Sequence, residues 1–230
     1  MTTLALEFST WTRSAAVRAS DGRAGSAVWG DGRATPAFSL IDEALRAAGA
    51  ARDEVRRLVI GLGPGSYTGI RAALAVAQGW RLATGVEVVG VSSSAAIAWE
   101  ARQDGRRGAA RVVVDAQRGE FYVADFRLTE ACLEDVAPLR LVPAYAMMQG
   151  TPADTWFLGP GLSTEIPNLP GWPTATALLA LADDPARVVR AEPLEPIYLR
   201  APTFVKAPPA ALRWAAEASR AMASAPGESA

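Results

Sequence analysis

Two acidic residues lie at the ends of apolar runs in different parts of the chain. Glu7 lies near the end of the first run, 3–8, and is followed by the hydroxyl side chains of Ser9 and Thr10, while Asp115 directly follows the run 111–114. If each run is the first strand of one of two lobes that meet over a cleft, paired carboxylates at the floor of that cleft could hold Mg²⁺ for phosphoryl transfer or for nuclease chemistry. The alternative is that both are solvated acids at strand ends.

Composition excludes several other classes of site. The 230 residues contain no histidine and one cysteine, Cys132, which excludes a Ser-His-Asp triad, a His-ligated metal site, a zinc cluster of several cysteines and an intrachain disulfide. The formal net charge of −1 provides no global basic field, so a nucleic-acid partner has to be met by a local patch or through another protein. We expect a cytosolic protein, because no apolar run is long enough for a membrane span and the N-terminus lacks a basic signal region.

A glycine-rich turn joins a predicted strand at 58–62 to a predicted helix at 70–84. The glycine spacing does not fit G-x-G-x-x-G, and the only lysine, Lys206, is far from any Walker-type loop. Two interpretations remain open: a helix N-terminus whose amides hold a phosphate or a partner's carboxylate, or a tight connection without a ligand. The residues of this loop are Gly63, Pro64, Gly65, Ser66, Thr68 and Gly69, of which Ser66 or Thr68 can cap the helix.

The spacing of the apolar runs predicts the order β-β-β-α-β-α-β-α. Three short strands with short connections favour an antiparallel meander, and two crossovers extend it into a mixed five-stranded sheet. The predicted strands are 3–8, 14–20, 25–29, 58–62 and 87–91, and the predicted helices are 38–48, 70–84 and 95–102. Thr35 and Pro36 predict the start of the first helix, and Gly49 and Gly85 predict the ends of the first two.

This order is that of the ribonuclease-H-like fold and of each half of the actin, sugar-kinase and Hsp70 (ASKHA) fold. We therefore predict an α/β protein with two ribonuclease-H-like lobes, the second of them shortened. The predicted domains are 1–105, 106–205, and a C-terminal helix and tail at 206–230 that packs back on the first lobe. In the second part, strands are predicted at 111–114, 120–126 and 155–158, and helices at 174–182 and 210–223.

The predicted helix 70–84 is apolar on more than one face. Such a helix is buried on more than one side, so we expect one face on the sheet and another against the first helix and a partner chain. The alternative is a helix covered entirely by its own domain.

Four segments resemble the TsaB (YeaZ) family. Residues 63–71, GPGSYTGIR, resemble the GPGSFTGLR signature of that family, and residues 4–10, LALEFST, are similar to its opening ILAIDTST. Residues 115–122, DAQRGEFY, resemble its DARRxEVY segment, and residues 196–200, PIYLR, match its PxYLR. The four segments occur in the family's order and extend over most of the chain.

The resemblance implies a non-catalytic subunit, without metal or cofactor, that acts in making N6-threonylcarbamoyladenosine next to the anticodon of tRNAs that read codons beginning with A. It implies docking on TsaD, action with the ATPase TsaE, self-association through much the same surface, and contact with tRNA only through the complex. In this family the partner-binding surface is formed by the first two helices. The implied interface residues are Phe38, Ile41, Leu45, Ile70, Arg71, Ala73, Leu74, Ala77 and Trp80.

Glu7, Ser9, Thr10 and Asp115 would then form a degenerate nucleotide cleft. Two alternatives stay open at this point. One is a small ASKHA-type phosphotransferase that uses Glu7 and Asp115 with Mg²⁺ and ATP. The other is a ribonuclease-H-like nuclease.

Overall fold

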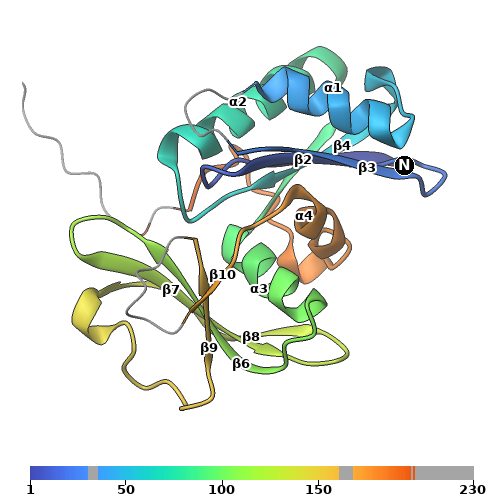
Figure 1. Cartoon of the computed structure of the whole chain (residues 1–230). Coiled ribbons are helices and arrows are strands. Elements are labelled where there is room, and N and C mark those ends of the chain that lie inside the picture. The colour runs from blue at the N-terminus through green and yellow to red at the C-terminus, as the bar shows by residue number, and fades with distance from the viewer. Residues whose placement is uncertain (31–35, 161–167, 198, 200–230) are drawn as a thin grey trace, which may run out of the picture. The chain divides into compact units, whose positions relative to one another are not determined.

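A computed structural model shows a mixed α/β protein with two five-stranded sheets (Figure 1). The structure describes residues 1–30, 36–160, 168–197 and 199. The predicted cap at Thr35 and the predicted helix over 210–223 lie outside the described residues.

The first sheet has the strand order β3-β2-β1-β4-β5. Its strands are β1 (Thr2–Glu7), β2 (Arg13–Arg18), β3 (Ala24–Trp29), β4 (Val55–Gly61) and β5 (Glu87–Val91). The first three pair antiparallel, and β4 and β5 run parallel to β1. The meander with two parallel crossovers that the sequence predicted is confirmed.

Helices α1 (Ala37–Ala48) and α2 (Tyr67–Thr84) cover one face of the first sheet (Figure 1). Both end at glycines in the left-handed conformation, Gly49 with φ 61° and Gly85 with φ 72°, as predicted. At the start of α2, the Ser66 side chain accepts a hydrogen bond from the Gly69 amide at 3.2 Å, so Ser66 is the cap. A fully apolar cluster, with side chains from both helices and from β1, β2 and β4, fills the space beneath the helices.

The second sheet has the order β10-β9-β6-β7-β8. Its strands are β6 (Gly108–Asp115), β7 (Glu120–Leu128), β8 (Leu133–Pro143), β9 (Trp156–Gly159) and β10 (Asn168–Pro170). The sequence predicted β6, β7 and β9 but not β8 or β10, so this sheet is larger than expected. The short 3₁₀ helices are Arg52–Glu54, Ala144–Ala146 and Pro185–Arg187.

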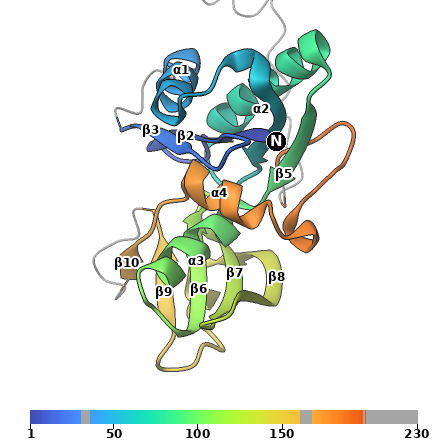
Figure 2. The ribbon, with the colours of Figure 1, turned by 90° about the vertical axis from the view of Figure 1, so that its right-hand side faces the viewer.

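Helices α3 (Ser93–Gln103) and α4 (Ala175–Leu181) lie between the two sheets (Figure 2). Helix α4 contacts β1 and β2, whereas α3 contacts β6, β7 and β9, and the two helices contact each other. A second apolar cluster joins these helices to Ala5 and Val59 of the first sheet and to Val112 and Phe126 of the second. The two sheets therefore share a core, and the predicted domain boundary at residue 105 stays a prediction.

The segment 188–197 runs along the edge of the first sheet. Val189 and Gly90 exchange two backbone hydrogen bonds of 2.8 and 2.9 Å, and the Ile197 amide donates to the Leu62 carbonyl at 2.9 Å. Glu192 pairs with Arg81 of α2. The last described residues are thus tied to the strand that leads into the glycine loop. No helix within the described ranges has the length and apolarity needed to cross a membrane.

Candidate functional site

Glu7 is a buried carboxylate held entirely by its own chain. Its side chain is 0% exposed, with Oε1 accepting from the Ser9 amide at 2.7 Å and Oε2 accepting from the Ser93 hydroxyl at 2.7 Å. Burial raises the pKa of Glu7, and the hydrogen bonds from Ser9 and Ser93 only partly oppose that rise. The group is therefore placed to hold the strand end together rather than to meet a ligand.

Asp115 has a different environment. It is exposed, and its two carboxylate oxygens accept from the backbone amide and the side-chain amide of Gln117 at 2.7 and 3.0 Å. It lines a cavity of about 430 Å³ together with Ser9 and Thr10, whereas Glu7 does not line that cavity. The structure thus brings three of the four predicted cleft residues together and places the fourth in the core.

Aromatic side chains form much of the wall of this cavity. Trp11, Tyr67 and Trp172 line it, and the rings of Trp11 and Trp172 lie 5.4 Å apart at an interplanar angle of 51°. No arginine or lysine is among the described lining residues, so a polyphosphate has no positive side chain to pair with here. Within the described ranges, no three His, Cys, Asp or Glu side chains are placed to share a metal ion.

The glycine loop packs tightly against the residues that follow β1. The Ser66 amide donates to the Ser9 carbonyl at 2.6 Å, and a side chain at Gly65 or Gly69 would collide with the backbone of Ser9 or Phe8. The Gly63 amide donates to the Ser93 hydroxyl at 3.1 Å. These glycines are explained by close packing within the chain, which favours the tight connection among the two interpretations of the loop. Pro64 is buried and Thr68 is exposed.

Most of the predicted interface residues turn out to be core residues. Six of the nine have side chains that are 0–5% exposed: Ile41, Leu45, Ile70, Ala73, Leu74 and Ala77. They face the first sheet, where the α1 and α2 side chains fill the core beneath the helices. These six side chains pack within the chain, so contact with another protein has to come mainly from the exposed residues of the two helices, and the assignment of the six as interface residues stays a prediction. Phe38, Arg71 and Trp80 do reach the surface.

The outer face of α2, together with Phe38 of α1 and the 3₁₀ helix Arg52–Glu54, forms an apolar groove of about 460 Å³. It is lined by Phe38, Arg52, Asp53, Ala75, Val76, Gly79, Trp80, Ala83 and Thr84. Phe38 is 60% exposed at one side of this groove. The predicted interface residues do not include Ala75, Gly79 and Ala83, although their spacing of four residues puts them on one face of a helix. Exposed apolar side chains beside a groove are typical of an interaction surface.

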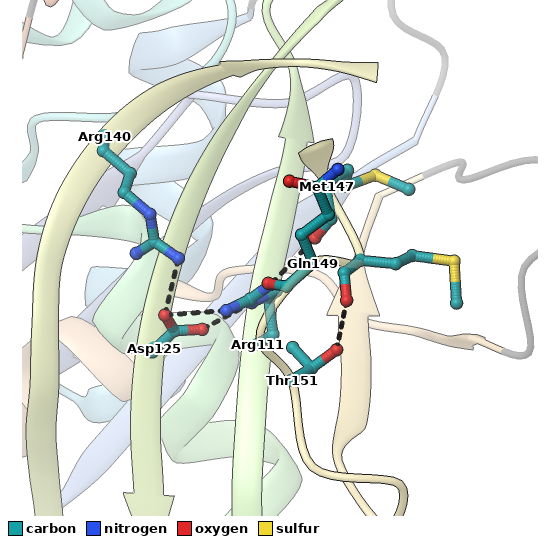
Figure 3. Close-up of polar contacts among 7 residues, drawn as sticks. Arg111, Asp125, Arg140, Met147, Gln149 and Thr151 are labelled. Atoms are coloured by element: carbon teal, nitrogen blue, oxygen red, sulfur yellow. Dashed lines mark hydrogen bonds and ion pairs between the residues drawn. The ribbon is translucent and has the colours of Figure 1, made fainter. Parts of the chain in front are cut away.

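A cluster of charged side chains lies on the face of the second sheet opposite the one that packs on α3, and Figure 3 shows its polar contacts. Arg111, which is 5% exposed, forms two hydrogen bonds of 2.6 and 3.1 Å with the carboxylate of Asp125, and Arg140 donates to the same carboxylate at 2.7 Å. Burial alone would raise the pKa of Asp125, but the two arginines outweigh it and hold that pKa below its ordinary value.

Arg111 also supports the loop that follows β8. Its remaining terminal nitrogen donates to the carbonyls of Met147 and Gln149 at 2.9 and 3.1 Å (Figure 3). Met147 packs with Val113, Val123 and Phe157 in a small apolar cluster. The charged cluster therefore supports the loop, and no sequence motif indicated it.

Comparison with known proteins agrees with the fold. The model of a family described as "TsaD: tRNA N6-adenosine threonylcarbamoyltransferase" matches residues 36–164. The protein Rv3421c of Mycobacterium tuberculosis, described as uncharacterized, is 32% identical over 168 residues, which span 71% of each chain. The Escherichia coli protein named "tRNA threonylcarbamoyladenosine biosynthesis protein TsaB" is 31% identical over 118 residues, or 45% of this chain and 50% of the relative. The chain belongs to the TsaB (YeaZ) family.

Solved structures of TsaB (YeaZ) relatives have the same fold over most of their length. A Pseudomonas aeruginosa protein described as similar to the peptidase YEAZ superposes with a TM-score of 0.74 at 28% identity, covering 86% of this chain and 99% of that chain. A second structure, YeaZ from the same organism, gives a TM-score of 0.72 at 27% identity, with the same coverage. The resemblance predicted from four short segments is confirmed.

Proposed function

We propose that this TsaB-family chain is a non-catalytic subunit that docks on a TsaD-family protein and is required for its activity. The reaction is transfer of a threonylcarbamoyl group to N6 of the adenosine 3′ of the anticodon, in tRNAs that read codons beginning with A. The names of the curated relatives support this process, and the match to a TsaD family model supports kinship with the transferase.

The apolar groove on the outer face of α2 is the observation that carries the proposal. A 460 Å³ groove with Phe38 exposed beside it needs a covering partner, and the core beneath it is already filled by side chains of the same two helices. We infer that TsaD covers this face, that a second copy of the chain covers it when TsaD is absent, and that the TsaE ATPase joins the assembled complex. Contact with tRNA is made through the complex, in the cytoplasm.

The state of the predicted acidic pair supports a non-catalytic role. Glu7 is enclosed by Ser9 and Ser93, and Asp115 lies in a separate environment at the wall of a cavity. A phosphotransferase or nuclease would need both carboxylates at one metal. In this proposal the two sheets are the ASKHA-type lobes of a paralogue of TsaD that works by holding its partner in the active geometry.

The decisive experiment is size-exclusion chromatography with light scattering, on the chain alone and mixed with TsaD from the same organism. A defined heterodimer that forms at the expense of any homodimer is the expected result. Unchanged elution beside folded, active TsaD would overturn the proposal. Calorimetry with Mg²⁺ and ATP addresses the phosphotransferase alternative, which requires binding that is lost in Asp115→Ala.

A further inference from the structure

Gly79 is a glycine that the chain itself does not require. It lies inside the 18-residue helix α2, is exposed, and is not among the glycines with positive φ. A Cβ added at this position would meet no atom within 4 Å. By contrast, a Cβ at Gly61, Gly65 or Gly69 would collide with the chain. Glycine destabilises the interior of a helix relative to alanine, so this residue lowers the stability of α2 without any benefit to the isolated fold.

The position of Gly79 suggests that the glycine serves contact with another helix. It lines the apolar groove between Val76 and Trp80 in the sequence, one turn from both Ala75 and Ala83. The absence of a side chain there leaves the backbone of α2 open to solvent. A second helix can pack most closely where such a position meets it, because helix separation depends on the side chains at the contact.

We propose that Gly79 is the point of closest approach between α2 and a helix of a TsaD-family partner. This inference rests on the proposed function and deepens it by naming the residue at which the partner helix packs most closely. The occupant is argued from kinship: the TsaD family model matches residues 36–164, which include both α1 and α2. A TsaD-family protein therefore carries counterparts of both helices, and homologous surfaces can pack on one another about an approximate two-fold axis.

The charges around the groove agree with an apolar occupant. Arg52 and Asp53 are its only charged lining residues among those described, and Arg52 is already paired with Asp42 at 2.5 Å. The walls close to Gly79 are the apolar side chains of Val76 and Trp80. The segment that enters the groove therefore presents an apolar side chain or a bare helix backbone.

Gly79→Ala and Gly79→Leu test this inference in the full chain, with purified TsaD as the probe. Gln78→Ala is the matched control, because Gln78 is exposed on the same helix but does not line the groove. We expect Gly79→Ala to raise the Tm of the isolated chain by about 2–4 °C while weakening TsaD affinity about tenfold. Gly79→Leu should abolish binding, and Gln78→Ala should leave the affinity unchanged.

The outcomes separate this inference from the proposed function. If the unmodified chain does not bind TsaD, the proposed function fails, and this inference fails with it. If the unmodified chain binds and Gly79→Leu binds equally well, only the role of Gly79 is overturned. If Gly79→Leu loses self-association but keeps TsaD binding, the occupant is a second copy and the TsaD assignment is overturned.

Discussion

The carboxylate of Glu7 lies directly against the Cα of Gly61 on the neighbouring strand β4. A methyl group at position 61 would overlap the carboxylate oxygen that Ser93 holds and crowd the one that Ser9 holds. The Glu7 carboxylate thus occupies the space that a side chain at position 61 would need. The acid that the sequence suggested for a ligand site is a fixed part of the packing beneath the glycine loop.

Replacing Gly61 with alanine should destabilise the fold. The added methyl group forces the Glu7 carboxylate or the strand to move, which costs about 1–3 kcal/mol of the free energy of unfolding. Urea unfolding of Gly61→Ala, Glu7→Ala and the double variant measures the coupling. We expect the double variant to lose less stability than the sum of the single losses, because removal of the carboxylate makes room for the methyl group. Additive losses would show that the two residues do not share this space.

Glu7 should give the fold an unusual pH dependence. Burial raises the pKa of Glu7 in the folded chain. The favourable contribution of the protonated side chain to the free energy of unfolding is therefore complete at pH values below the pKa of the unfolded chain. That contribution is lost as the pH rises through the raised pKa. We expect the stability of Glu7→Gln relative to the unmodified chain to increase with pH over this window. In Glu7→Gln, the side chain still accepts from Ser9 and stays neutral at every pH.

The exposed acid Asp154 supplies the control for that pH experiment. Asp154→Asn removes one negative charge at the surface, so it tests whether loss of charge alone has the same effect. Urea midpoints are measured for the three proteins at several pH values. A constant difference between Glu7→Gln and the unmodified chain would contradict the prediction.

Asp125 should give the fold the opposite pH dependence of stability. Arg111 and Arg140 hold its pKa below the ordinary value, so its contribution is present above the pKa of the unfolded chain and is lost as the pH falls through the lowered one. Asp125→Asn leaves the buried Arg111 without its anionic partner, and we expect a loss of about 3–5 kcal/mol at neutral pH. The control is Asp135→Asn, which removes an exposed carboxylate from Arg187 while Asp184 stays as a second partner of that arginine, and which should cost less than about 1 kcal/mol. Equal losses would mean that the pairing of Asp125 with the buried Arg111 contributes no more to the free energy of unfolding than the pairing of Asp135 with Arg187.

The order of the first sheet could be predicted because its strands are short, apolar and separated by short turns. Strand β8 (Leu133–Pro143) could not be, because it carries few buried side chains and contains Pro138, which sequence rules treat as a break. β8 is an edge strand, and Pro138 falls where the pairing between β7 and β8 shifts register. An edge strand with an irregularity tolerates proline because no neighbour needs its amide.

The proposed partner-binding face was harder to predict, for a related reason. Helix α2 carries apolar residues on more than one face, so periodicity alone does not tell which face packs on the sheet. Ala73 and Ala77 face the core, whereas Ala75, Gly79 and Ala83 line the outer groove. Alanine and glycine suit both environments, and only the tertiary fold distinguishes them.

The same arginine substitution at two nearby positions of α2 tests that distinction. Ala73 is 0% exposed beneath the helix and Ala75 is exposed in the groove. Ala73→Arg buries an unpaired charge, so we expect loss of cooperative unfolding and of all functions together. Ala75→Arg should keep the circular dichroism spectrum and a Tm within a few degrees of the unmodified chain, because alanine and arginine are both good helix formers.

Ala75→Arg should nevertheless lose binding to TsaD, since its long charged side chain projects into an apolar groove that the partner must fill. Gln78→Arg is the control, because it adds the same charge at an exposed position of α2 outside the groove. Thermal unfolding and light scattering with TsaD measure stability and binding separately. A folded Ala75→Arg variant that still forms the heterodimer would place the partner elsewhere, because no helix could occupy this groove beside an arginine at its floor.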